Sequence, residues 1–254
     1  NADIDVTVTS VTGTIDRGVR GISAFSLGGD AYVASEDNTD SGGHGGGAKT
    51  FTITHEGDIT VSVAGLDQAS TFEELSGGIV ALSIGGNGGD GPQTIANSQK
   101  GGNGGVASSS DGSTTSDIES LVETDNATIT TSGDHVMGIA AVTAGGNGGD
   151  GRESSDGGNG GFGGTVKVDL DHTDISTGGE SAYGVYAVAR GGNGGAFKDS
   201  SGLLDFGSDQ AGHGQLAGNV KTNGYGSTIT TSGDHAHGMV AQALGGLGGD
   251  ASSG

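Results

Sequence analysis

The chain has 254 residues, of which 58 are glycine, one is proline and none is cysteine or tryptophan, and its formal net charge is −22. Collagen is excluded because it needs abundant proline beside its glycine, and disulfide scaffolds and cysteine-based zinc sites are excluded by the absence of cysteine. The charge argues against nucleic-acid binding by phosphate neutralisation, and no stretch approaches the roughly 20 apolar residues of a membrane-spanning helix.

The glycines are periodic rather than scattered. A nine-residue pattern, a short apolar strand that runs into a glycine pair, occupies residues 21–29, 78–86, 138–146, 184–192 and 238–246. Its leading glycines are 57, 60, 46 and 54 residues apart. Five copies indicate a repeat architecture rather than a flexible low-complexity chain. We therefore expect one domain of five repeats, with approximate bounds 3–48, 49–106, 107–164, 165–218 and 219–254.

Each repeat is predicted to hold three short strands. Apolar and polar residues alternate with period two in segments such as 6–9, 51–54 and 166–170, and threonine, valine and isoleucine dominate them. This pattern is typical of half-buried strands. In the fourth repeat the strands are expected at 165–170, 173–177 and 184–189. The second repeat carries an insertion near 65–75, which we expect to be a loop.

Strands this short cannot form a core alone, so successive repeats must stack. Stacking would place Ile129, Ile175 and Ile229 above one another. The sequence thus predicts an all-β fold, a right-handed parallel β-helix (a β-solenoid), with about one three-strand coil per repeat of 46–60 residues. The residues expected to define the coil are the leading glycines and their followers: Gly21, Ile22, Gly78, Ile79, Gly138, Ile139, Gly184, Val185, Gly238 and Met239.

Glycine clusters follow each third strand and come in pairs in the first three repeats. GGNGG occurs at 85–89, 101–105, 145–149, 157–161 and 191–195, and GGLGG at 245–249. We expect each pair to be two extended arms, one leaving the coil and one returning, packed in polyproline-II-like geometry; the alternative is a flexible spacer. The fourth repeat has only Gly212-His213-Gly214 and Gly218 for its return. The expected arm residues are Gly85, Gly86, Gly88, Gly89, Gly145, Gly146, Gly148, Gly149, Gly191, Gly192, Gly194 and Gly195.

Calcium is the one cofactor that the sequence suggests. Asp90, Asp150 and Asp250 each end a GGxGxD segment, the start of the calcium-binding β-roll nonapeptide. The nonapeptide wants a large apolar residue two positions later, where Pro92, Arg152 and Ser252 stand. We therefore expect no cofactor and a solvated acidic surface, and keep weak calcium binding by these aspartates or by other acidic loops as the alternative.

No catalytic residue is predicted. Polysaccharide-active β-helices need carboxylates and basic residues gathered on one face, whereas the nine basic residues here are spread along the chain. His135 and His235 sit in matching Gly-Asp-His segments that read as turns. Pairs of the form Thr-x-Thr at 7–9, 52–54, 128–130 and 228–230 suit a solvent-facing strand or, alternatively, an ice-binding ladder. We therefore expect no enzyme, and keep a carbohydrate-active β-helix as an alternative.

Residues 228–246, which read TITTSGDHAHGMVAQALGG, and the similar segment 128–149 resemble the glycine-rich repeats of bacterial autotransporter passenger domains and related giant surface adhesins. The resemblance implies a protein outside the cell or on a bacterial surface, with a role in adhesion, aggregation or matrix formation. Its partners would be further copies or neighbouring repeats, surface glycans or other cells, and neither nucleic acid nor the membrane interior.

Two departures from that family bear on assembly. No signal peptide precedes Asn1 and no barrel follows Gly254, so we expect either a segment of a longer protein or a processed unit. Uncapped end coils of a β-helix pair edge to edge, and a head-to-tail contact that does not close produces a fibre. The sequence therefore predicts a structural or adhesive module that polymerises into surface fibres, with a calcium-dependent acidic binding module as the runner-up.

Overall fold

The computed structural model of the chain describes residues 4–8, 18–32, 41–49, 51–64, 69, 71–91, 100–107, 119–151, 155–199 and 210–253. Within these ranges the protein is all-β, and its strands pair in parallel in three sheets. The one helical element in the described part is a short 3-10 turn, η1 (Phe72–Glu74). The all-β class and the parallel pairing agree with the sequence prediction.

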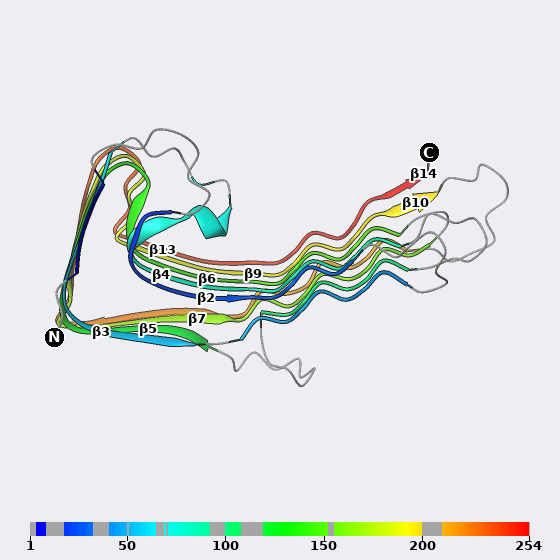
Figure 1. Ribbon diagram of the computed structural model, residues 1–254, viewed down its shortest axis with the longest axis horizontal. Helices are drawn as coiled ribbons and strands as arrows, with labels where there is room; N and C mark the ends of the chain where they lie inside the picture. The colour runs from blue at the N-terminus through cyan, green and yellow to red at the C-terminus, as the bar shows by residue number, and fades with distance from the viewer. Residues whose placement is uncertain are drawn as a thin grey trace.

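The first sheet curls around one end of the molecule. It contains β1 (Ile4–Val8), β3 (Thr52–Val63), β5 (Glu119–Ser132), β7 (Thr165–Asp171), β8 (Asp174–Gly178), β11 (Val220–Tyr225) and β12 (Thr228–Ser232). The long strand β5 pairs with β7 through its first half and with β8 through its second half. In Figure 1 the first halves form the lower layer, and the second halves turn upward at the left.

The corner between the two halves has a backbone explanation. Residues with positive φ occupy it in four units: Gly57 (107°), Asn126 (47°), His172 (44°) and Gly226 (60°). Glycine, asparagine and histidine enter this left-handed region more readily than most residues. The long strands of the second and third units bend here, whereas the fourth and fifth units break into two strands.

The second sheet lies above the lower layer in Figure 1, and the chain leaves it toward the right. It contains β2 (Arg20–Leu27), β4 (Ser76–Ile84), β6 (Val136–Ala144), β9 (Val185–Arg190) and β13 (Met239–Leu244). These are the five copies of the apolar pattern. The register is constant along the stack, because Ile139 lies opposite both Ile79 and Val185, and Val185 lies opposite Met239. The third sheet pairs β10 (Phe197–Asp199) with β14 (Ala251–Ser253).

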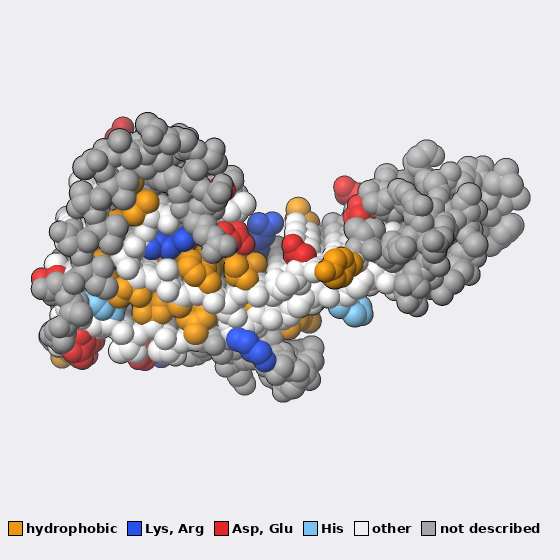
Figure 2. Space-filling model, viewed as in Figure 1, with side chains coloured by type: hydrophobic (Ala, Val, Ile, Leu, Met, Phe, Trp, Pro, Cys, Tyr) orange, Lys and Arg blue, Asp and Glu red, His pale blue; other side chains and the backbone are white. Residues whose placement is uncertain are grey.

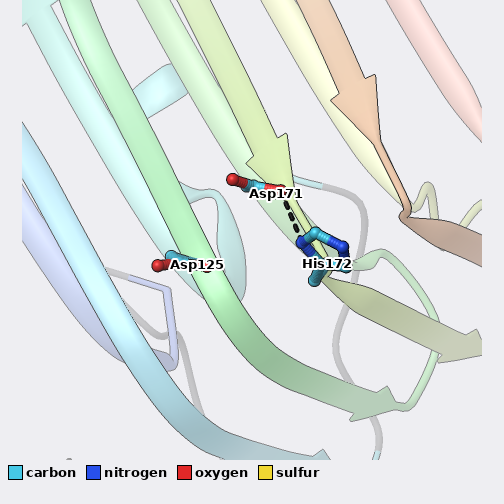
Figure 3. Close-up of side chains that lie close together, drawn as sticks. All are labelled: Asp125, Asp171 and His172. Atoms are coloured by element: carbon cyan, nitrogen blue, oxygen red, sulfur yellow. Dashed lines mark ion pairs between the residues drawn. The ribbon is translucent and has the colours of Figure 1, made fainter.

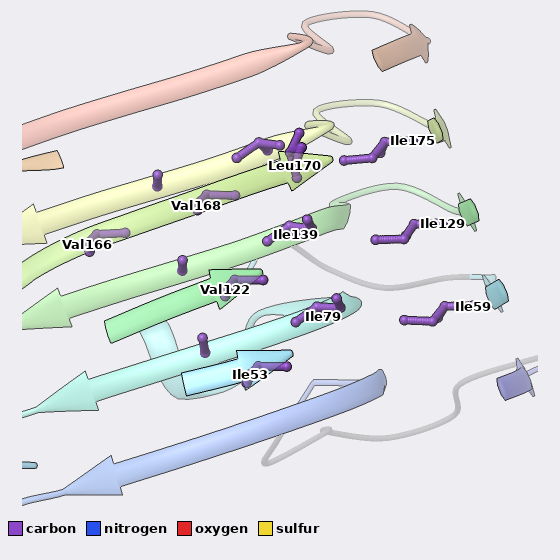
Figure 4. Close-up of a cluster of buried hydrophobic side chains, with 14 of the residues drawn as sticks. Ile53, Ile59, Ile79, Val122, Ile129, Ile139, Val166, Val168, Leu170 and Ile175 are labelled. Carbon is purple, nitrogen blue, oxygen red and sulfur yellow. The ribbon is translucent and has the colours of Figure 1, made fainter. Parts of the chain in front are cut away.

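The hydrophobic core lies between the two larger sheets (Figure 4). In β3 alternate residues are buried, and Ile53, Ile59 and Val61 point into the core. The inward residues of the second sheet complete it with smaller side chains such as Ala81 and Ala187. Burial of these files of apolar side chains against their neighbours is what makes each unit depend on the next.

The predicted strands of the fourth repeat, 165–170, 173–177 and 184–189, are confirmed within one residue at each start and end by β7, β8 and β9. The predicted isoleucine file is also confirmed, since Ile175 lies opposite both Ile129 and Ile229. The leading glycines lack a Cβ and so leave space for these isoleucine side chains. A Cβ at Gly138 would lie 2.5 Å from Cγ2 of Ile175 and 2.5 Å from the carbonyl oxygen of Gly184.

The Gly-Asp-His segments form the predicted turns. Gly133 and His135 both have positive φ, and so do Gly233 and His235. Glu180 of the fourth unit stands between the two turns, because its N–H donates to Oδ1 of Asp134 (2.8 Å). The N–H of Ser181 in turn donates to the carbonyl of Asp234 (2.8 Å). These histidines therefore serve the turn geometry in each unit.

The described part of the insertion, residues 69 and 71–75, covers the outer face of the second sheet. Leu75 is buried against a second cluster that includes Val80, Leu82 and Val142, and Phe72 packs beside it. The sequence placed a loop here, and η1 adds a single helical turn to it. The positions 65–68 and 70 lie outside the described residues. The insertion makes the second sheet a layer that is buried on both faces in the middle units, as the fully buried β6 shows.

Candidate functional site

The predicted glycine arms form two rows that run side by side away from the sheets (Figure 1). The outgoing row consists of residues 28–32, 85–91, 145–151, 191–196 and 245–250, and the returning row consists of 42–48, 101–107, 157–163 and 210–216. In Figure 2 the described part of the arms forms a narrow, mostly white extension of the body toward the right. The rows account for the glycine clusters that the sequence singled out.

Neighbouring arms of one row bond at every third residue. The N–H of Gly85 donates to the carbonyl of Ala144 at the end of β6, and those of Gly88 and Gly91 donate to carbonyls of the next outgoing arm, all at 2.8–2.9 Å. The same step of three recurs at Gly145, Gly148 and Gly151. Three residues per turn is the period of a polyproline-II-type helix. The expectation that arms of successive units pack side by side is therefore confirmed.

The glycines between these positions bond across the rows. The N–H of Gly146 donates to the carbonyl of Gly105, and the N–H of Gly105 donates to the carbonyl of Gly86 (2.8 and 2.7 Å). The main chains approach so closely that a Cβ at Gly146 would lie 1.9 Å from the carbonyl oxygen of Gly86. The arms therefore require glycine at these positions for space, not for flexibility.

The fourth repeat has a returning arm, although its sequence offers few glycines. The N–H of Gly212 donates to the carbonyl of Gly195, and Gln215 donates to Gly192 (2.8 and 3.0 Å). The carbonyl of His213 accepts from Gly160 (2.9 Å). The backbone bonds thus persist where Gln215 replaces a glycine, which the cluster pattern alone did not predict.

The N–H of the middle residue in each outgoing GGNGG segment meets no main-chain acceptor of the described arms, either along its row or across the rows. The Oδ1 of an Asn or Asp in the preceding arm accepts this N–H at 2.7–3.0 Å, and these side-chain bonds form a ladder along the arms. This ladder runs through Asp30, Asn87, Asn147, Asn193 and Leu247. Its sequence separations of 57, 60, 46 and 54 residues equal those of the leading glycines.

Further ladders follow the same rule. In the returning row Nδ1 of His44 accepts from Asn103, and the series continues through Asn159 to His213 at 2.8–2.9 Å. Satisfaction of otherwise unpaired N–H groups explains why the middle residue of GGNGG is so often asparagine. Sequence reasoning missed this role, although the repeated asparagine was its signal.

Removal of one ladder acceptor should have a modest, measurable cost. Asn147→Ala leaves the N–H of Asn193 without its protein acceptor, and we expect the free energy of unfolding to fall by about 0.5–1 kcal/mol. Asn147→Asp keeps an Oδ1 acceptor and should lose much less. Urea unfolding followed by circular dichroism measures both. Equal losses in the two variants would contradict the ladder role.

An ion pair ties two returning arms together. Nζ of Lys100 lies 2.6 Å from Oδ2 of Asp156, whose Oδ1 accepts the N–H of Gln210. The hydrogen bond and charge of Lys100 hold the pKa of Asp156 below its ordinary value of 3.8. The same partner raises the pKa of Lys100 above 10.5. Because the carboxylate pKa is lowered on folding, its contribution is present above pH 3.8 and is lost as the pH falls through the folded pKa.

The Lys100–Asp156 ion pair should make the stability of the protein depend on pH, and the Asp156→Asn variant tests this. Asp156→Asn keeps the Oδ1 acceptor for Gln210 but removes the charge. We expect wild type to be slightly more stable than Asp156→Asn at pH 7, and the difference to be smaller at a pH well below 3.8, because protonation of Asp156 removes the ion pair. Urea midpoints at the two pH values measure this. A difference that persists undiminished in acid would contradict the assignment.

The aspartates of the calcium alternative take part in the arms. Oδ1 of Asp90 accepts the N–H of Asp150 (3.0 Å), and Oδ1 of Asp150 accepts that of Ala196 (2.9 Å). The carbonyl of Asp250 accepts from Phe197 (2.9 Å). Each aspartate thus has a structural role in the stack, and calcium binding there stays an alternative.

Among the described residues, one group brings three potential metal ligands together: Asp125, Asp171 and His172, whose ligand atoms lie within 4.8 Å of one another (Figure 3). The strand register places Asp125 opposite Asp171. Nδ1 of His172 lies 2.6 Å from Oδ1 of Asp171, and Oδ1 of Asp125 accepts from Asn126 (2.7 Å). The group is largely exposed. The strand pairing at the corner of the first sheet and these two contacts are sufficient to hold the three side chains near one another.

The Thr-x-Thr pairs do not form a continuous ladder. Thr52 and Thr54 lie opposite Leu121 and Glu123, and Thr128 lies opposite Asp58 and Asp174. Carboxylates therefore interrupt the threonine files, because Thr52 and Thr54 precede the corner of their unit whereas Thr128 follows the corner of its own. The regular array that the ice-binding alternative requires is absent from the described strands.

A half-open groove of about 680 Å³ lies between the insertion and the outer face of the second sheet. Its lining includes Phe72, Glu73, Tyr183, Tyr186, Arg190 and His237. A smaller hollow of about 360 Å³ near Asn87 and Asn147 shares Phe72, Glu73 and Arg190 with it. Sequence reasoning missed this groove, since it arises from an insertion in the second unit and side chains of the fourth and fifth.

Comparisons with protein-family models, with curated proteins and with solved structures found no match. Among the described residues, no helix has the length and apolar character required to cross a membrane.

Proposed function

We propose that the chain is a segment of an extracellular bacterial surface protein, a right-handed β-solenoid of five coils with a structural or adhesive role. The resemblance of 228–246 to autotransporter passenger repeats supports the location and role. The constant register of β2, β4, β6, β9 and β13 supports a solenoid with one coil per repeat. Its partners are other units of the same kind, and surface glycans or other cells. The protein works by shape and assembly, without catalysis.

The observation that carries this proposal is the regular pattern of main-chain hydrogen bonds between successive outgoing arms. Each outgoing arm donates to the next one, as Gly148 does to Asn193 and Gly194 does to Leu247 (2.8 Å each). The arm at 245–250 occupies the final place, and among the described residues Gly245 and Gly248 have no acceptor for their N–H groups. The same pattern would let them donate to an arm like 28–32.

The edge strands are suited to such continuation. β2 and β13 are the two edges of the second sheet. Leu27 on β2 and Leu244 on β13 are 48% and 47% exposed. The register of the stack would bring Leu27 of a following unit over Leu244. Burial of exposed apolar side chains and pairing of free strand edges both favour this contact, and its repetition produces a filament.

Electron microscopy and sedimentation of the purified protein test the proposal. We expect filaments, and a sedimentation coefficient that increases with protein concentration. Leu244→Glu places a charge in the contact and should abolish filaments without unfolding the chain, since Leu244 is half-exposed. Thr130→Glu, the same added charge on the outer face of β5, should leave them intact. Monomers at all concentrations, or filaments unaffected by Leu244→Glu, would contradict the proposal.

A further inference from the structure

The floor of the large groove is the outer face of the second sheet. Alternate residues of each strand face outward there, and the register aligns them into files. One file runs from Val80 through Ala140 and Tyr186 to Val240, and the next contains Val188 and Gln242. The insertion covers the start of these files. Tyr186, Val240 and Gln242 of the fourth and fifth units line the groove, whereas Val188 is buried.

One wall of the groove is held firmly. Nε of Arg20 donates to the carbonyl of Leu75 (2.9 Å), and its guanidinium also donates to the carbonyl of Glu73. Leu75 is buried in the outer cluster below. The backbone of 73–75 is therefore fixed over the sheet by hydrogen bonds and by packing. A groove with one anchored wall and a sheet for its floor is pre-formed, which limits the entropy lost on binding.

Three aromatic rings form the other wall. Tyr183 stands between Tyr186 and His237, with ring centroids 5.8 and 5.5 Å apart and interplanar angles of 29° and 30°. The rings are therefore nearly parallel, and all three residues line the groove. Burial and the neighbouring Tyr183 raise the pKa of Tyr186. The Tyr186 hydroxyl therefore stays protonated at neutral pH and is able both to donate and to accept a hydrogen bond.

Polar side chains complete the lining at several points. Arg190 follows Tyr186 along β9 and faces the same side, Gln242 comes from β13, and Glu73 comes from the insertion. Among the described residues the Arg190 guanidinium forms no ion pair. A cation, a carboxylate, an amide and hydroxyl groups thus surround the parallel rings.

We propose that this groove binds a neutral oligosaccharide. The negative face of an aromatic ring attracts the C–H face of a pyranose ring, and the surrounding polar groups match sugar hydroxyls as donors and acceptors. The volume of about 680 Å³ lies within the usual range for small-molecule sites. A polyanionic glycan is disfavoured because the chain carries a net charge of −22.

The groove is suited to binding rather than to hydrolysis. Glycoside hydrolysis uses two carboxyl groups across the scissile bond, and the described lining has one, Glu73. The site rests on the glycan partners of the proposed function and gives them a place on the chain, but it does not depend on filament formation. Loss of glycan binding would leave filament formation unchanged.

Isothermal titration calorimetry with cellohexaose, maltohexaose and hexagalacturonic acid tests the proposal. We expect at least one neutral hexasaccharide to bind with a Kd below about 1 mM, and more tightly than the anionic one. Tyr186→Ala should weaken binding about tenfold or more, as removal of a central aromatic contact does. Tyr186→Phe retains the ring and should stay within about threefold of wild type.

Tyr225→Ala is the matched control. Tyr225 is 72% exposed and contacts His172 at the corner of the first sheet, away from the groove. Its replacement should leave the Kd unchanged, and circular dichroism should show that each variant retains its strands. The proposal is overturned by the absence of binding to both neutral hexasaccharides, by preference for the anionic one, or by equal losses in the Tyr186→Ala and Tyr225→Ala variants.

Discussion

Replacement of Gly146 by alanine is expected to destabilise the protein by at least about 2 kcal/mol. The added Cβ would lie 1.9 Å from the carbonyl oxygen of Gly86 and 2.5 Å from its carbon, both of them backbone atoms of the neighbouring arm. That arm is held by its own hydrogen bonds to Gly46 and Gly105, so it cannot yield without breaking them. The loss should appear as a lower urea midpoint.

Gly29→Ala provides the matched control. Gly29 is the second glycine of its arm, as Gly146 is, but a Cβ there meets nothing within 4 Å. Alanine in place of glycine also restricts the unfolded chain, so this variant should range from neutral to about 1 kcal/mol more stable. If both variants lose stability equally, close packing of the arms is not the reason for their glycine.

Truncation of Ile129 to alanine is expected to cost about 2–5 kcal/mol. Ile129 is fully buried at the corner of the core, between Ile59 and Ile175 in the same file. Its Cγ2 also fills the space above Gly78, where an added Cβ would meet it at 2.5 Å. The cavity would therefore interrupt contacts to the units on both sides, and thermal or urea unfolding should reveal the loss.

Thr130→Ala is the control for Ile129→Ala, because Thr130 lies in the same strand but is not buried. Thr130 is exposed on the outer face of β5, so Thr130→Ala should change stability by no more than about 0.5 kcal/mol. A large loss in Thr130→Ala, or a negligible one in Ile129→Ala, would contradict the placement of the core between the two sheets.

The strands and their stacking were predictable because periodicity alone encodes them. The alternation in segments such as 166–170 fixes which residues of β7 point inward, and the spacing of the leading glycines fixes which residues meet across units. Ile129, Ile175 and Ile229 could be aligned without coordinates because each precedes a Gly-Asp-His or similar turn by a constant distance.

Other features depend on contacts between units that no local pattern encodes. The corner at Asn126 and His172 follows from backbone conformations that several residue types can adopt. The insertion folds over side chains of other repeats, so the groove beside Tyr183 and Tyr186 has no signature in any one of them. The asparagine ladder was encoded by repetition of Asn87, Asn147 and Asn193, yet its meaning depends on which N–H groups the arms leave unpaired.

Amide hydrogen exchange in the arms, read residue by residue by NMR, tests the central claim most directly: the glycine clusters are ordered, hydrogen-bonded arms that continue the stack. Gly145, Gly146, Gly148 and Gly149 each donate to a neighbouring arm or strand at 2.8–2.9 Å. In the Leu244→Glu variant, which should not form filaments, we predict that these four amides exchange far more slowly than the amide of Gly248, which has no acceptor among the described residues. Exchange of all five at the rate of an unstructured peptide would contradict the account.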